Sequence, residues 1–287
     1  MPTFSLIVPT FGRADELNQL FTSLCEQSPS TIEVIVVDQN DDDRVVPYLE
    51  LLGSGIARQH LRVSKKSLSN ARNVGLAHAS GEYVAFPDDD CWYPSGLLPR
   101  LERWFDDHPD YDILAVGAED EAGLVSGNRW PQDHCDIRPH NSLRTTFSNS
   151  LFLRRGSLSK EILFDETMFS SEETDYVLRQ IRAGCRGRFD RGLHICHPRR
   201  DMLSGTVSHR RAERYGRGMG QLVRRHSLLF LWGGLLGYEC LRAGMVAVRG
   251  NFSGATFCLA HAYGIFRGFF ASAQQERRGH WSPHSKV

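Results

Sequence analysis

The amino-acid sequence predicts an α/β fold over about residues 1–200, built on a mixed, mostly parallel sheet, with a C-terminal helical appendage. Short, β-rich apolar runs alternate in this part with segments whose apolar residues recur at helical spacing, which is the pattern of βαβ units. Carboxylates stand directly after two of the apolar runs, at strand ends where open α/β sheets bind ligands. From Arg199 onwards arginines become frequent and the apolar segments lengthen.

Composition limits the classes of function. The chain has 287 residues, of which 41% are hydrophobic and 24% charged, as in a globular protein with a sizeable core. Its formal net charge is zero, so binding of nucleic acid through bulk electrostatics is not expected. The seven cysteines show no paired spacing, which predicts free thiols in a reducing cytoplasm. The sequence opens on a strand rather than on a signal-like apolar segment, so we expect a cytoplasmic protein.

The first two predicted strands flank a helix. Residues 4–8 are a β-rich apolar run that ends at Pro9, which predicts a buried strand. A helix over about residues 14–26 has its leucines and Phe21 on one face. Residues 32–38 are β-branched and almost wholly apolar, as a central parallel strand should be, and they end at a carboxylate, Asp38.

Residues 69–94 hold the densest cluster of candidate site residues. A helix with small apolar residues ends in a Ser-Gly pair, and the apolar run at 83–86 is too short for a helix, so it predicts a buried strand. Asp88, Asp89 and Asp90 follow at once. Adjacent carboxylates repel one another unless a cation lies among them, and hard oxygen ligands of this kind suit Mg²⁺ or Mn²⁺. A solvated acidic turn is the alternative interpretation.

The other predicted elements of this part are less distinctive. Residues 118–148 are polar and irregular, which fits either a binding loop or a plain surface loop. Further on, Ser171 is followed by acidic residues, an arrangement typical of the first turn of a helix. In order, we also expect a strand at 61–63, a helix at about 95–107, a strand at 113–117 and a strand over about 147–154.

Several of these motifs occur together in a known family. Ala71-Arg72-Asn73-x-Gly75, then Gly81-Glu82-Tyr83, the apolar strand and the acidic cluster, resembles the donor-site core of family 2 glycosyltransferases. The resemblance extends over about residues 3–200 and implies the GT-A fold, a nucleotide-binding α/β sandwich. One position departs from the usual Asp-Ser-Asp-Asp form, because Pro87 stands where the first Asp normally does.

The resemblance implies roles for residues at the strand ends. In the family, the Pro-Thr-aromatic turn after the first strand touches the nucleotide base, and an Asp after the second strand lies against uracil or ribose. Arg72 could pair with phosphate or with Asp38. Residues 192–198 follow a short predicted strand, and a histidine near this position assists the metal or the diphosphate in many relatives. The donor-binding candidates are Pro9, Thr10, Arg13, Asp38, Arg72 and Asp88, and the metal-binding candidates are Asp88, Asp89, Asp90 and His197.

A second acidic cluster provides the candidate base. Residues 169–179 resemble the family signature Gly-Glu-Asp-x-Asp-hydrophobic-x-x-Arg, whose central Asp is the catalytic base. Glu173 holds that position here, between Glu172 and Asp175. Like-charge neighbours and partial burial raise the pKa of a carboxyl, as a base working near neutral pH requires. Glu173 is the first candidate and Asp175 the second, and helix capping is the alternative role of these acids.

Residues 201–287 are predicted to form a basic, amphipathic helical region that associates with a membrane. Residues 215–220 are glycine-rich and loop-prone, and the apolar segments after them carry arginines on their flanks. The longest strongly hydrophobic run is about a dozen residues, whereas crossing a bilayer takes roughly 20. We therefore expect peripheral contact with anionic lipid at the inner face of the cell membrane. A helical hairpin that covers the core, or a dimer contact, is the alternative.

The resemblance implies an inverting glycosyltransferase that uses a divalent metal, Mn²⁺ or Mg²⁺. It would move a sugar from a nucleotide-diphosphate donor to a hydroxyl of a glycan or lipid-linked acceptor in surface polysaccharide synthesis. Two alternatives stay open. A sugar-phosphate nucleotidyltransferase would have a glycine- and basic-rich phosphate loop after the first strand, which residues 9–13 match poorly. A non-catalytic nucleotide-sugar-binding membrane protein is compatible with Pro87 and Glu173.

Overall fold

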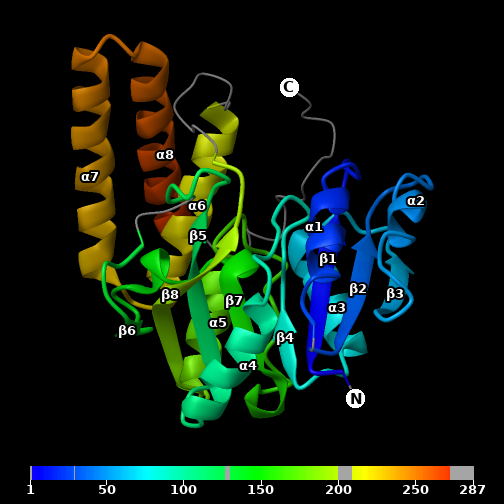
Figure 1. The fold of residues 1–287 in the computed structure, drawn as a ribbon. Helices are drawn as coiled ribbons and strands as arrows, with labels where there is room; N and C mark the ends of the chain where they lie inside the picture. Colours follow the sequence, from blue (N-terminus) through cyan, green and yellow to red (C-terminus); the bar gives the residue numbers. More distant parts are fainter. Residues whose placement is uncertain (1, 29, 127–129, 200–208, 272–287) are drawn as a thin grey trace. The chain divides into compact units, whose positions relative to one another are not determined.

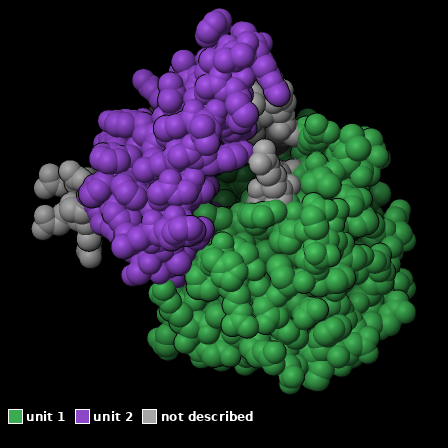
Figure 2. Space-filling view, turned by 90° about the vertical axis from the view of Figure 1, so that its left-hand side faces the viewer, with its two compact units in different colours: residues 1–164, 176–199 green, residues 165–175, 200–287 purple. Residues whose placement is uncertain are grey.

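The computed structural model describes residues 2–28, 30–126, 130–199 and 209–271. The chain divides into two compact units, which have different colours in Figure 2. Unit 1 comprises residues 1–164 and 176–199, and unit 2 comprises residues 165–175 and 200–287. The predicted domain over residues 1–200 differs from unit 1 in one segment, because residues 165–175 group with the C-terminal helices.

The described residues of unit 1 form one mixed sheet of eight strands, in the order β3-β2-β1-β4-β7-β5-β8-β6 (Figure 1). The first four strands in this order run parallel to one another, β7 is antiparallel to β4 and β5, β8 is parallel to β5, and β6 is antiparallel to β8. The predicted α/β class with a mixed sheet is confirmed. The strands are β1 (Phe4–Thr10), β2 (Ile32–Asp38), β3 (Ala57–Arg62), β4 (Tyr83–Ala85), β5 (Ile113–Glu119), β6 (Cys135–Asp136), β7 (Leu151–Arg154) and β8 (Gly187–Cys196).

Helices connect the strands and follow them. In unit 1, α3 packs against β1 and β2. The α-helices are α1 (Leu17–Leu24), α2 (Val46–Leu49), α3 (Leu68–His78), α4 (Leu97–Asp107), α5 (Glu172–Arg182), α6 (His209–Arg225), α7 (Leu229–Val248) and α8 (Phe252–Phe270). Short 3-10 helices lie at Ser142–Arg144, Ser148–Ser150 and Arg155–Ser157.

Three strands differ clearly from their predicted extent. β7 begins at Leu151, whereas a strand over about residues 147–154 was predicted, because Ser148–Ser150 form a 3-10 helix. β3 occupies residues 57–62, where 61–63 were predicted, because this edge strand is mostly polar and lacks an apolar pattern. β8 is ten residues long, whereas only a short strand before Gly192 was expected. Its alternation of buried and exposed side chains breaks where its register with β5 shifts, between Val116 and Gly117.

β1 and β2 form the centre of the core of unit 1 and position the candidate site. Every residue of both strands is buried, and full burial of each aliphatic side chain contributes about 1.5–3 kcal/mol. Their register pairs Thr10 with Asp38. Because β4 is also parallel to β1, the carboxyl ends of β1, β2 and β4 lie at one edge of the sheet.

Glycines bring two helices of unit 2 into backbone contact. The prediction of a loop at residues 215–220 is wrong, since these residues lie inside α6. A Cβ atom on Gly216 would lie 2.1 Å from the carbonyl oxygen of His261 in α8, and one on Gly264 would lie 2.1 Å from that of Glu213 in α6. Glycine in a helix costs about 1 kcal/mol of stability relative to alanine. The close packing of α6 on α8 offsets this cost, and a local sequence pattern cannot reveal such packing.

Gly264→Ala should therefore lower the free energy of unfolding of the helical part by about 1–3 kcal/mol, because the added methyl group overlaps the α6 backbone. Urea denaturation followed by circular dichroism measures this loss. Gly237→Ala in α7 is the matched control, since a Cβ atom there meets nothing within 4 Å. Equal stability of the two variants would contradict the described packing of α6 on α8.

α7 and α8 combine a polar contact between them with an apolar surface. Glu239 of α7 is 4% exposed, and its carboxylate lies 3.3 Å from Nδ1 of His261 in α8. Of the helices that the structure describes, none has both the length and the apolar character needed to cross a membrane. Exposed apolar side chains on the two helices are Leu229, Phe230, Tyr238, Leu241, Met245, Val248, Phe252, Leu259, Tyr263, Phe266 and Phe270.

Candidate functional site

The ends of three parallel strands bring the predicted donor and metal residues together. β1 ends at Thr10, beside the end of β2 at Asp38. β4 ends at Ala85, and the buried Phe86 and Pro87 lead the chain into the acidic turn. Residues far apart in the sequence thus meet at the sheet edge where the sequence predicted a site.

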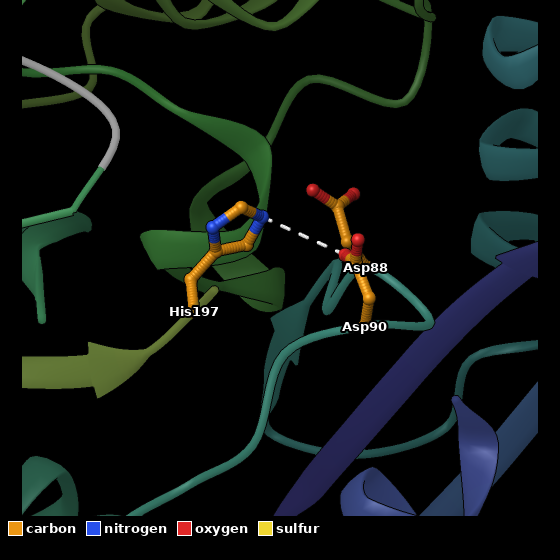
Figure 3. Close-up of side chains that lie close together, drawn as sticks. All are labelled: Asp88, Asp90 and His197. Atoms are coloured by element: carbon orange, nitrogen blue, oxygen red, sulfur yellow. Dashed lines mark ion pairs between the residues drawn. The ribbon is translucent and has the colours of Figure 1, made fainter. Parts of the chain in front are cut away.

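Asp88, Asp90 and His197 form a group whose possible ligand atoms all lie within 4.8 Å of one another (Figure 3). His197 follows β8 directly, and its backbone N–H donates to the carbonyl of Glu119 over 2.8 Å. Its Nε2 lies 3.5 Å from Oδ1 of Asp90. The structure therefore places His197, one of the predicted metal-binding candidates, beside the acidic cluster.

Asp89 has different neighbours from the other two acids. The Thr10 hydroxyl donates to Oδ2 of Asp89 over 3.1 Å, and the Arg13 guanidinium donates to its Oδ1. Arg13 also donates to Oδ2 of Asp90 over 3.0 Å. Asp89 was predicted as a metal ligand, but in the structure it joins β1 to the acidic turn and lies outside the group with His197.

Arg72 lies beside Asp88. Its side chain is almost fully buried, donates to the Ser148 hydroxyl over 2.6 Å and lies 3.8 Å from Oδ1 of Asp88. Its guanidinium also lies 5.4 Å from the centre of the Phe164 ring. The side-chain amide of Asn149 donates to Oδ2 of Asp88 over 3.2 Å. An acidic partner for Arg72 was expected, and it is Asp88 rather than Asp38.

Asp38 is fully buried at the end of β2. Its Oδ1 accepts hydrogen bonds from the backbone and side chain of Asn40, at 2.9 and 2.8 Å, and its Oδ2 lies 2.9 Å from Nε2 of His60. Neither His60 nor Asn149 was predicted as a site residue. His60 lies on the polar edge strand, and Asn149 follows a region with no regular pattern. For His60, the available signal was a polar residue on the strand that pairs with β2.

The acidic turn holds more negative charge than its arginines balance. Burial raises the pKa of Asp88, and Asp90 raises it further against the lowering effect of Arg72. Burial, with Asp90 and Asp88, raises the pKa of Asp89 to about 7 in spite of Arg13. A cation stabilises such a cluster of carboxylates. Two carboxylates and one imidazole form a ligand set that fits a divalent metal such as Mn²⁺.

The second acidic cluster lies in the part of α5 that belongs to unit 2. Asp175 is fully buried, with Nε2 of His226 2.9 Å from its Oδ1 and an Arg225 nitrogen 3.3 Å from its Oδ2. Glu172 is 8% exposed, whereas Glu173 is more accessible. Of the three predicted candidates, Glu173 thus has the side chain most open to a substrate.

Comparison with known proteins identifies the kind of chain to which this site belongs. Residues 5–159 match the model of the family described as glycosyl transferase family 2. A pre-mycofactocin glycosyltransferase of Mycobacterium tuberculosis is 27% identical over 241 residues, which cover 77% of this chain and 48% of that protein. The GalNAc(5)-diNAcBac-PP-undecaprenol beta-1,3-glucosyltransferase of Campylobacter jejuni is 30% identical over 184 residues, 62% of this chain and 59% of the relative. The chain thus spans about half the length of these relatives.

Solved structures share the fold. The structure of Staphylococcus aureus TarS 1–349 has a TM-score of 0.61 at 17% identity, and the match covers 97% of this chain and 92% of TarS 1–349. A mannosyltransferase of Pyrobaculum calidifontis, solved in complex with GDP-Man and Mn²⁺, has a TM-score of 0.63 at 15% identity, with 94% and 87% covered. The arrangement of strands and helices is therefore that of the GT-A fold.

Proposed function

The chain belongs to glycosyl transferase family 2, and on that premise we propose that it moves a sugar from a nucleoside-diphosphate donor to a hydroxyl group. The observation that carries this proposal is the group of Asp88, Asp90 and His197 at the ends of parallel strands. We propose a glycan or lipid-linked acceptor in surface polysaccharide synthesis, because the Campylobacter jejuni relative is named for an undecaprenol-linked substrate.

Asp88, Asp90 and His197 would hold a divalent cation. The mixture of carboxylate and imidazole favours Mn²⁺ over Mg²⁺, which prefers oxygen ligands alone. When bound, the cation would neutralise the negative charge that develops on the leaving diphosphate. Arg13 and Asp89 would keep Asp90 in place, because Arg13 donates to both carboxylates.

The chain's own residues would bind the donor and transfer the proton. We assign the contacts with the nucleobase and ribose of the donor to the turn at Pro9, Thr10 and Arg13 and to Asp38. We assign a contact with the donor phosphates to Arg72. Glu173 would take the proton from the acceptor hydroxyl. The hydroxyl oxygen of the acceptor would bond to the anomeric carbon, while the bond from that carbon to the diphosphate oxygen breaks. A single displacement of this kind inverts the anomeric configuration. The partial exposure of Glu173 supports this role.

Donor binding is tested by thermal shift. The melting temperature is measured with a panel of nucleoside-diphosphate sugars, each with and without Mn²⁺. We expect one nucleotide class to raise the melting temperature, and Mn²⁺ to increase that rise beyond the effect of Mn²⁺ alone. A panel that gives no shift with Mn²⁺ present would contradict the proposed donor site.

The exposed side chains of α7 and α8 support a peripheral contact with the inner face of a membrane. Around the turn between the two helices, Val248 is 90% exposed and Phe252 71% exposed, and Arg249 lies between them in the sequence. Each arginine near an anionic membrane surface contributes about 1 kcal/mol of attraction, and the apolar side chains can enter the headgroup region. We therefore propose that this turn binds anionic lipid.

The double variant Val248→Ser/Phe252→Ser should bind vesicles of anionic lipid at least about 10-fold more weakly than the natural protein, because two exposed apolar groups are removed. Flotation of liposomes measures the bound fraction, and high salt should release the natural protein. Leu124→Ser, an exposed apolar residue of unit 1, is the matched control. Equal flotation of all three proteins, or no binding to anionic vesicles, would contradict the proposed contact.

A further inference from the structure

A buried hydrogen bond joins the residue after α6 to the first turn of α5. His226 directly follows α6, and its Nε2 lies 2.9 Å from Oδ1 of Asp175. Both side chains are 0% exposed, so water does not compete for this contact. A buried carboxylate is stable only when its oxygens are paired, so loss of the imidazole would leave Asp175 short of a partner.

Arg225 forms ion pairs with acids at both ends of the segment 165–175. Its Nη1 lies 2.7 Å from Oδ2 of Asp165 and 3.3 Å from Oδ2 of Asp175. Although burial alone would raise the pKa of Asp165, hydrogen bonds from Thr167 and Arg225 hold it below its ordinary value. The two acids that bound the segment are thus tied to one guanidinium at the end of α6.

The middle of the segment also lies against α6. The Arg217 guanidinium is 4.1 Å from the centre of the Phe169 ring, and the Ser170 hydroxyl donates to the carbonyl of Tyr215 over 3.0 Å. Gly218 allows this approach, because a Cβ atom there would lie 2.2 Å from Oγ of Ser170. α6 therefore contacts the segment along its length rather than at one point.

The residue before α5 has an unfavourable backbone conformation. Ser171 has a φ of 61°, in the left-handed region that a residue with a side chain rarely adopts. Its carbonyl accepts the N–H of Asp175 over 3.0 Å, which closes the first turn of α5. Such a conformation persists only where the surroundings fix it. The contacts of α6 and the His226–Asp175 pair are the surroundings that do so.

From this cluster we infer that His226 and Arg225 are positioning residues for Glu173. They hold Asp175, Asp175 holds the first turn of α5, and that turn carries Glu173 two residues earlier. The inference rests on the proposed role of Glu173 as the base. If the base is misplaced, kcat falls while the donor Kd stays unchanged, because misalignment affects only the chemical step.

His226→Leu should lower kcat by about 10-fold or more. The Kd for the nucleotide sugar that raises the melting temperature, measured with Mn²⁺, should stay unchanged. Hydrogen exchange of the backbone amides at residues 172–176 should become faster, because the turn opens more often. His226→Gln keeps an N–H donor at a similar reach and should restore most of the kcat and the slow exchange. Val223→Ala, a change at a fully buried position near the end of α6, should alter neither.

The same series separates failure of this inference from failure of the proposed function. Arg225→Gln removes the bridge at a side chain that is 32% exposed, so it serves if His226→Leu does not fold. Natural kcat and exchange in both variants, or an equal effect of Val223→Ala, would overturn the positioning role. Glu173→Gln is measured alongside: if it keeps full activity, the proposed base is wrong, whatever His226 does. If it is inactive while His226→Leu and Arg225→Gln behave naturally, only the present inference is wrong.

Discussion

Glu173→Gln should reduce the kcat of sugar transfer by about 100-fold or more and leave the affinity for the donor unchanged. Glutamine keeps the size and hydrogen-bonding reach of glutamate but cannot take up the proton of the acceptor hydroxyl. The structure favours Glu173 for this role, because Glu172 is 8% exposed and Asp175 is fully buried beside His226 and Arg225. The kcat follows from steady-state release of nucleoside diphosphate, and the donor Kd from titration calorimetry.

Two neighbouring variants control this result. Glu172→Gln changes an adjacent acid and should cost less than about 10-fold in kcat if Glu173 is the base. Asp175→Asn should also lower kcat, but together with faster hydrogen exchange in the first turn of α5, since it removes the charge that His226 and Arg225 hold. If Asp175→Asn gave the large loss with unchanged exchange and Glu173→Gln gave none, the base would be Asp175.

Asp90→Ala should abolish the part of donor binding that depends on Mn²⁺. Asp90 connects the proposed metal ligands, because its Oδ1 lies 3.5 Å from His197 and its Oδ2 accepts from Arg13. Its removal leaves only two of the three proposed ligands, Asp88 and His197. In calorimetric titrations the variant should lose its measurable affinity for Mn²⁺, and its donor Kd with Mn²⁺ should equal the value measured without metal.

Comparison with Asp89 sharpens this test. Asp89→Asn should keep the affinity for Mn²⁺ and weaken donor binding, because Asp89 contacts Thr10 and Arg13 rather than the group with His197. Asp107→Asn, at an exposed acid at the end of α4, should behave like the natural protein. Unchanged Mn²⁺ affinity in Asp90→Ala would contradict the assigned ligands, and loss of that affinity in Asp89→Asn alone would return the metal to the ligand set that the sequence first indicated.

The strands of the core and the place of the site were predictable, because local patterns determine them. The apolar runs of β1, β2 and β4 predict buried strands, and the polar residues after them mark the edge where parallel strands bind ligands. His197, which the family resemblance implied as a metal-binding candidate, lies beside the acidic cluster. β3 was placed poorly because an edge strand does not need apolar side chains on both faces, and His60 was missed with it.

The roles of adjacent residues could not be derived from the sequence. Asp88, Asp89 and Asp90 are chemically alike, and only the turn geometry and the hydrogen bond from the Thr10 hydroxyl separate Asp89 from its neighbours. The same holds for α6, whose glycines predict a loop by propensity but form a helix that packs on α8 and on Ser170. The pairing of His226 with Asp175 joins residues 51 positions apart, a contact that no local pattern specifies.

The most direct test of the account is a transfer assay with the donor that raises the melting temperature. The protein, Mn²⁺ and that donor, labelled in the sugar, are incubated with and without an extract of lipid-linked oligosaccharides. We predict that nucleoside diphosphate and labelled lipid-linked sugar form in equal amounts, only with the extract, and that both products are lost in Glu173→Gln and Asp90→Ala. Tight donor binding with no release of nucleoside diphosphate under any of these conditions would contradict the account and would identify the chain as a non-catalytic nucleotide-sugar binder.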